Sequence, residues 1–230
     1  SPGGHVFRFA GGAPVYVSNY ANVGGAPPAS SITGIDKAAI DNASAGYPWN
    51  QIRKFPADGT FVMSPGGSAY VFVGGAPLPF TSWSIYGNPA RTVVDVASLN
   101  SGRTDYPFSR VRQTPADGTF VTAHSTGHVY RFAGGAPIYV SAWPNVGGQQ
   151  STRTVDSAVI DRAGGTGGWS HVRKYPADGT ILRSGPSGLY YEVRSGLPTS
   201  RPAASAAVVV DPFTISNAGG PPPFDNLKAA

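Results

Sequence analysis

The chain repeats the same short motifs about every 60 residues. "PADGT" begins at Pro56, Pro115 and Pro176, and "GGAP" begins at Gly11, Gly74 and Gly134. A fixed period is the signature of a repeat protein, in which each copy is one supersecondary unit that buries apolar surface against its neighbours. The fold must therefore be built from small, similar units.

Two weaker series indicate a fourth copy. An aspartate preceded by Val or Ile recurs at Asp36, Asp95, Asp156 and Asp211. A large aromatic residue stands four positions before a basic residue in the pairs Trp49–Arg53, Phe108–Arg112, Trp169–Arg173 and Phe224–Lys228. We therefore predict a single repeat domain over residues 1–230, with copies at about 1–63, 64–123, 124–184 and 185–230.

Each copy is expected to contribute a three-stranded meander. "DGTFV" predicts a short strand after an Asp-Gly turn, and "VYRFA" and "PIYV" predict two more. The Gly-Gly between them suits a two-residue hairpin turn, in which both central residues need positive φ. The predicted pairs in the third copy are Phe132–Pro137, Tyr130–Tyr139, Arg131–Ile138 and Val129–Val140.

Short helical turns should follow each hairpin. Ser18, Thr81–Ser82 and Ser141 are candidate N-caps for the first turn. "VDSAVIDRAGG" predicts a second short helix, with Asp156 as its cap and Gly164 as its stop.

Both faces of the predicted hairpin are largely apolar, so the sheets must be stacked or covered. The chain has 31 Gly and 22 Pro, yet 40% of its residues are hydrophobic and 11% aromatic, which favours strands joined by tight turns over disorder. We expect a mainly β fold, a four-repeat β-propeller-like ring of short antiparallel meanders with short helical turns. An open stack is the alternative.

The sequence begins at the second strand of the first copy and ends before the "DGT" of a fifth. We expect either a ring that closes with one strand missing or part of a longer array. A start at Ser1, without Met or a signal peptide, suggests a mature form or an excised domain.

Composition argues against several classes of protein. The net charge of +5 is not gathered into a basic run, which disfavours a nucleic-acid partner. No apolar run is long enough to predict a membrane span. The absence of cysteine excludes disulfides, thiolate metal sites and a cysteine nucleophile.

Motifs for catalysis are also missing. There is no G-x-S-x-G elbow, H-E-x-x-H or phosphate loop, and Glu192 is the sole glutamate. We expect that the protein is not an enzyme and binds neither a cofactor nor a metal. His124, His128 and His171 are candidate metal ligands, but the expected role of the first two is that of polar residues at strand ends.

The recurring aspartates have structural interpretations as well. Asp58, Asp117 and Asp178 of "PADGT" are expected to be turn residues that cap their own backbone. Asp36, Asp95, Asp156 and Asp211 are expected to be helix caps or partners of the four recurring basic residues.

The pattern G-x-V-Y-R-F-A-G-G-A-P-I-Y-V-S-x-W, followed by V-D-x-x-x-I-D and P-A-D-G-T, resembles tandem repeats of secreted actinobacterial proteins. Those repeats often stand beside cell-wall hydrolase or glycosidase domains. The resemblance covers the whole chain and implies an extracellular, non-catalytic accessory module. It carries no set of binding residues.

Aromatic residues at strand ends are the best candidates for a ligand site, because a sugar ring stacks its apolar face on them. The alternative is that the tryptophans hold the helical turn on the core. Arg8 and Arg131 recur in copies one and three only, so the fold does not demand them in every copy. The candidate ligand-binding residues are Arg8, Tyr16, Tyr20, Trp83, Arg131, Tyr139 and Trp143.

Copies one and three share the most sequence, which predicts two equivalent sites on a repeating polymer. We expect a secreted or cell-surface binding module for a carbohydrate polymer or cell-wall glycan. The alternative is a protein-interaction or structural spacer module of a larger secreted protein.

Overall fold

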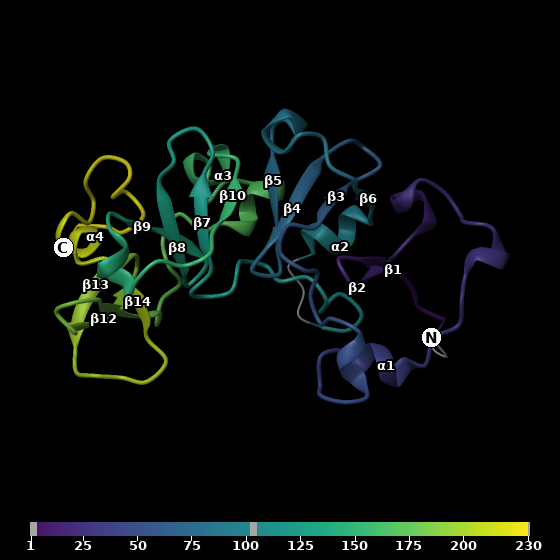
Figure 1. The fold of residues 1–230 in the computed structure, drawn as a ribbon, viewed down its shortest axis with the longest axis horizontal. Coiled ribbons are helices and arrows are strands. Elements are labelled where there is room, and N and C mark those ends of the chain that lie inside the picture. The colour runs from purple at the N-terminus through teal and green to yellow at the C-terminus, as the bar shows by residue number, and fades with distance from the viewer. Residues whose placement is uncertain (1–3, 102–104, 230) are drawn as a thin grey trace. The chain divides into compact units, whose positions relative to one another are not determined.

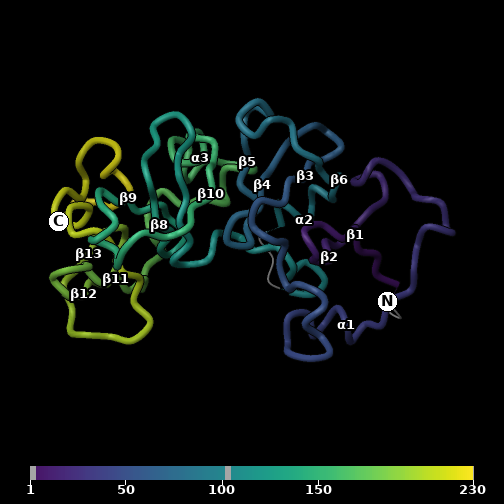
Figure 2. Tube along the Cα trace, viewed as in Figure 1, coloured from purple at the N-terminus to yellow at the C-terminus, as the bar shows by residue number. Residues whose placement is uncertain are grey.

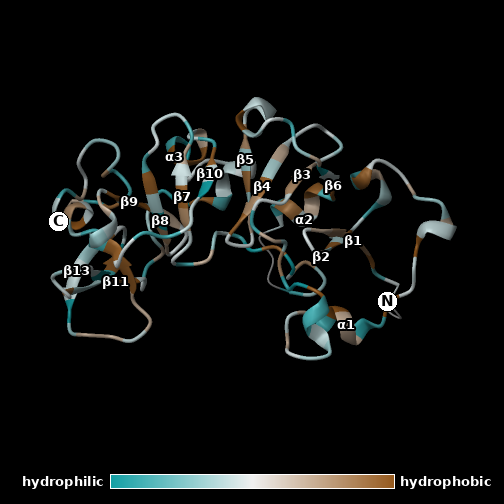
Figure 3. Cartoon of the chain, in the orientation of Figure 1, coloured by the Kyte–Doolittle hydropathy of each residue, from teal (hydrophilic) through white to brown (hydrophobic). Residues whose placement is uncertain are grey.

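The computed structural model describes residues 4–101 and 105–229. The chain divides into two compact units, residues 1–113 and 114–230. Figure 1 shows that both are built mainly from short strands, with helices of only a few residues. Hydrophobic residues gather on the strands, whereas most connecting loops are pale or hydrophilic (Figure 3).

Unit 1 contains two sheets. Among the described residues, the first has only the hairpin strands β1 (Val6–Ala10) and β2 (Ala13–Val17). The second has the order β5-β4-β3-β6, formed by β3 (Phe61–Met63), β4 (Ala69–Val73), β5 (Ala76–Phe80) and β6 (Thr92–Val93). Its helices are α1 (Lys37–Asp41), α2 (Val96–Asn100) and the 3-10 turns η1 (Tyr20–Val23), η2 (Ala29–Ser31), η3 (Trp49–Gln51) and η4 (Trp83–Tyr86).

Unit 2 contains two four-stranded sheets. One has the order β10-β7-β8-β9, formed by β7 (Phe120–Ala123), β8 (Val129–Ala133), β9 (Ala136–Val140) and β10 (Arg153–Val155). The other has the order β13-β12-β11-β14, formed by β11 (Ile181–Ser184), β12 (Tyr190–Arg194), β13 (Leu197–Arg201) and β14 (Val208–Val210). Its helices are α3 (Ala158–Asp161), α4 (Pro212–Ser216), η5 (Trp143–Val146) and η6 (Gly167–His171).

The mainly β prediction is confirmed, and so is the register of the third hairpin in all four predicted pairs. The sheets, however, are not purely antiparallel. In each four-stranded sheet the strand after "DGT" pairs on its second edge with a parallel strand, as β3 does with β6. The sequence did not predict these strands, because two or three residues are too few to carry a periodic pattern.

The Gly-Gly turn has two requirements that glycine meets. Gly134 and Gly135 have φ of 54° and 80°, as a two-residue primed turn needs. A Cβ on Gly134 would also lie 2.8 Å from the amide nitrogen of Ala177, which donates a hydrogen bond to the Gly134 carbonyl. The turn is thus packed directly against the next "PADGT".

The aspartates of "PADGT" lie in turns, as predicted, but the predicted partner of their carboxylates is wrong. Instead of capping its own backbone, each carboxylate accepts a hydrogen bond from the first turn residue of the following hairpin. The pairs are Asp58 with the amide of Gly74 (2.8 Å), Asp117 with that of Gly134 (2.7 Å) and Asp178 with that of Ser195 (2.6 Å). Each "PADGT" therefore holds the turn of the hairpin that follows it.

The recurring Val/Ile-Asp aspartates are helix caps, as predicted. Asp36, Asp95 and Asp211 accept hydrogen bonds from the second residues of α1, α2 and α4, and Asp156 accepts one from Ala158 at the start of α3. α3 ends at Asp161, before the predicted stop at Gly164.

Asp95 and Asp211 are also fully buried, because the end of the preceding hairpin packs on each of them. The amide and hydroxyl of Ser18 donate to Asp95 at 2.6 and 2.7 Å, and those of Ser141 donate to Asp211, both at 2.7 Å. The predicted N-cap role of Ser18 and Ser141 is therefore wrong, whereas Ser82 does cap η4.

A second hydrogen bond strengthens each of these junctions. The Ser98 hydroxyl donates to the Tyr16 carbonyl at 2.7 Å, and the Thr214 hydroxyl donates to the Tyr139 carbonyl at 2.8 Å. Within each unit the end of one hairpin is thus held on the helical turn of the next copy. The buried apolar clusters include Phe72 in unit 1 and Leu182 in unit 2.

Asp95→Ala should destabilise unit 1 more than Asp36→Ala does. Both substitutions remove a helix cap, which costs about 1 kcal/mol. Only the first also removes the fully buried acceptor of the Ser18 amide and hydroxyl, and a hydrogen bond to a charged group is worth roughly 1.5–3 kcal/mol. Urea unfolding followed by circular dichroism measures the difference, and equal losses would contradict a stabilising role for the Ser18 contact.

Candidate functional site

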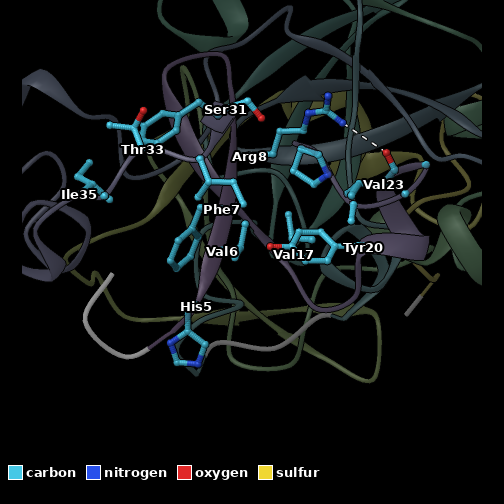
Figure 4. Close-up of a pocket in the computed structure, with 17 residues that line it drawn as sticks. His5, Val6, Phe7, Arg8, Val17, Tyr20, Val23, Ser31, Thr33 and Ile35 are labelled. Atoms are coloured by element: carbon cyan, nitrogen blue, oxygen red, sulfur yellow. Dashed lines mark hydrogen bonds between the residues drawn. The ribbon is translucent and has the colours of Figure 1, made fainter. Parts of the chain in front are cut away.

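A groove of about 720 Å³ lies along β1 in unit 1. One wall is the strand itself, Val6–Phe9, and the other is the segment 31–35, which begins at the end of η2. Figure 2 shows residues 24–35 as part of a wide excursion of the chain between β2 and α1. Val17, Tyr20 and Val23 close one end, as the side chains in Figure 4 show.

The groove exposes aromatic surface that the other copies bury. Phe9 stands two residues before its turn, as Phe72 and Phe132 do before theirs. The exposed fraction is 45% for Phe9 and 0% for Phe72 and Phe132. The first copy therefore leaves open an apolar position that the second and third copies bury.

Arg8 lies on the groove wall and is exposed. Its guanidinium donates to the carbonyl of Val93 at 3.0 Å and, as the dashed line in Figure 4 shows, to that of Val23 at 3.5 Å. Arg131, its counterpart in unit 2, donates to the carbonyl of Val209 at 2.6 Å. Both arginines therefore connect a hairpin to the parallel strand of the next copy.

The surroundings of the two arginines differ. The Arg131 guanidinium lies 4.9 Å from the centre of the Phe120 ring, and burial lowers its pKa from the ordinary value. No described strand stands beside Arg8 in the place of β7, and Arg8 lines the groove.

Tyr16 and Tyr139 are half-buried and lie at ring–ring contacts. Tyr16 meets Phe108 edge-on at 5.0 Å, and Tyr139 meets Phe224 edge-on at 5.4 Å. His128 packs against Tyr139 at 5.2 Å in the same way. Such contacts are worth about 0.5–1.5 kcal/mol each beyond area burial, so these tyrosines stabilise the junctions between copies.

Trp83 and Trp143 are half-buried on the aromatic residues of their own sheets. Trp83 meets Phe80 at 4.7 Å and carries the Arg91 guanidinium over its ring at 4.5 Å. Trp143 lies 5.6 Å from Phe120 and packs on a cluster with Val140 and Val146. Tyr20, in the same position of the first copy, instead faces the groove.

Among the seven predicted ligand residues, only Arg8 and Tyr20 line the groove, whereas their counterparts Arg131 and Trp143 both pack on Phe120 in unit 2. Sequence reasoning missed Phe9 and the segment 31–35. The sequence does carry a signal for the groove, because no "DGT" motif precedes the first hairpin. That signal predicts an open edge of β1 only if the "DGT" strand is known to lie between the hairpin and a parallel strand.

The groove offers little for chemistry. Its lining contains no Asp or Glu, so no carboxylate pair is available there for acid–base work. Across residues 4–101 and 105–229, no three His, Asp or Glu side chains are close enough to hold a metal ion. Over the same residues, no helix is both long and apolar enough to cross a membrane. What the groove does offer is an open strand edge, aromatic rings and a cation.

No protein-family model, no curated protein and no solved structure matches this chain.

Arg131→Ala should weaken the contact between β8 and β14 much more than Arg8→Ala weakens the contact between β1 and β6. A half-buried charged hydrogen bond is worth roughly 1.5–3 kcal/mol, whereas an exposed one is worth much less. Amide hydrogen exchange in β14 should therefore accelerate by roughly tenfold or more, and exchange in β6 should change little. Equal acceleration at both junctions would contradict the difference in burial.

Proposed function

We propose that this chain is a non-catalytic interaction module whose binding site is the groove along β1. The observation that carries the proposal is Phe9, an aromatic residue with 45% exposure at a position that is fully buried in the second and third copies. An extended polypeptide is the favoured ligand, because β1 pairs only with β2 among the described strands and offers its other edge for strand addition.

The resemblance to repeats of secreted bacterial proteins supports an accessory role at the cell surface or outside the cell. Four copies in a propeller-like ring remain part of this proposal. The three similar four-stranded sheets are consistent with a ring of similar blades.

A glycan is the second candidate ligand. Trp83 is half-buried and lies next to the exposed Ser82 and Ser84, and the Arg91 guanidinium lies over its ring at 4.5 Å; a sugar ring would stack on Trp83 in the place of Arg91. The groove also contains Tyr20 with Ser31 and Thr33. The polypeptide is favoured because a glycan would leave the strand edge without backbone partners.

Selection of random nine-residue peptides against the whole chain tests the proposal. Peptides of alternating polarity should be enriched, and Phe9→Ser should abolish their binding because it removes the apolar floor of the groove. Leu189→Ser is the matched control: Leu189 is 57% exposed and does not line the groove, so binding should persist. Peptides that bind the Phe9→Ser variant as well as the parent would contradict the proposal.

Cosedimentation with insoluble peptidoglycan, chitin or cellulose tests the second candidate. If a glycan is the ligand, Trp83→Ala should reduce retention while Leu189→Ser leaves it unchanged. Under the polypeptide proposal, neither the parent chain nor the two variants are retained on the glycan. Retention that is lost in Trp83→Ala would overturn the polypeptide proposal.

A further inference from the structure

The strand after "DGT" occupies the same place in all three four-stranded sheets. It is antiparallel to the first hairpin strand and parallel to the strand that precedes the Val/Ile-Asp motif. In sheet β10-β7-β8-β9, Phe120 is opposite Arg131, and Val121 is opposite both Tyr130 and Arg153. The register is the same for Phe61 and Val62 of β3 and for Ile181 and Leu182 of β11.

The walls of the groove are the counterparts of these neighbours. Counted from the Gly-Gly turn, Arg8 and Phe7 correspond to Arg131 and Tyr130. Counted back from the Val/Ile-Asp motif, Thr33 corresponds to Arg153. All three line the groove, and the described residues place no strand between the two walls. The groove therefore has the position of a missing "DGT" strand.

The side-chain pocket for that strand is also present. In unit 2, Phe120 packs with Val129, Val140, Trp143 and Val146, beneath Arg131. The residues at the same positions of the first copy are Val6, Val17, Tyr20, Val23 and Arg8, and every one of them lines the groove. The groove thus repeats the surroundings of Phe120 without an occupant among the described residues.

The backbone groups on the free edge of β1 are placed to pair with the same kind of strand. The amide of Phe132 donates to the carbonyl of Thr119, and its carbonyl accepts from the amide of Gly118, both at 2.8 Å. Phe9 faces Pro14 as Phe132 faces Pro137, so its N–H and C=O are directed away from β2, toward the groove. A strand edge with open donors and acceptors is a template for strand addition.

We propose that the groove binds a "PADGT"-type strand from a further copy of the repeat. This inference rests on the proposed function and names its partner. The incoming strand runs antiparallel to β1 and parallel to 31–35. Its Asp accepts from the Gly11 amide, as Asp117 does from the Gly134 amide at 2.7 Å. Its aromatic residue, three positions after that Asp, enters the pocket under Arg8.

A folded second copy of this chain is a poor donor. β3, β7 and β11 are each paired on both edges within their own sheets, so none is free to leave without unfolding. The donor is instead a strand that is not paired with a hairpin in its own chain. Its large apolar residue matches Phe61, Phe120 or Ile181, and its adjacent Asp-Gly matches the open amide at Gly11.

A fluorescent peptide with the sequence PADGTFVTA, residues 115–123, tests the inference by anisotropy against the whole chain. We expect saturable binding of one peptide per chain. Replacing the peptide's Phe by Ala, or its Asp by Ala, should weaken binding roughly tenfold or more, because each change removes a buried contact. Replacing its Gly by N-methylglycine removes the donor to Phe9 and should act likewise. Changes in the peptide leave the fold of the protein untouched.

Hydrogen exchange places the bound peptide. Protection of Val6–Phe9 and of residues 31–35 supports the inference. No binding, binding indifferent to the three peptide changes, or protection confined to unit 2 overturns it. If PADGTFVTA fails while selected random peptides bind in a manner that depends on Phe9, the proposed function stands and this partner is wrong. A chain that dimerises alone, with Phe9 protected, would also overturn it.

Discussion

The strand that follows "DGT" is the element on which each complete sheet depends. It pairs on both edges, with the hairpin on one side and a parallel strand on the other. Its apolar residues, such as Val62, Val121 and Leu182, are fully buried. The motif before it also fixes the neighbouring turn, because the Asp117 carboxylate bonds the Gly134 amide. One short segment therefore sets the register of the sheet and closes its turn.

Aspartate carboxylates also hold the junctions between copies. Asp95 and Asp211 cap a helix with one oxygen and hold the serine at the end of the preceding hairpin with the other. Burying a carboxylate is costly unless it is fully hydrogen-bonded, so the aspartate and its serine are needed together. Asp36, the first of the series, is exposed and keeps only its cap. Its exposure matches the open groove beside it.

Much of the fold could be predicted because local rules decide it. Gly134–Gly135 favours a two-residue primed turn, and that turn fixes every pair of β8 with β9. The parallel strands could not be predicted, because Thr92–Val93 is too short to carry a pattern. The roles of Arg8 and Arg131 were also out of reach, since their acceptors are carbonyls 85 and 78 residues away. For the same reason the sequence did not separate the exposed Phe9 from the buried Phe132.

Among the described strands, β1 lacks the partner that its counterparts β4, β8 and β12 have on their second edge. Residue-resolved amide exchange of the free chain by NMR tests it most directly, at Phe9, Phe72 and Phe132. The amides of Phe72 and Phe132 donate to Thr60 and Thr119 at 2.9 and 2.8 Å, so they should be strongly protected. The Phe9 amide should exchange at close to the rate of an open chain. Protection of Phe9 equal to that of Phe132 would contradict the account.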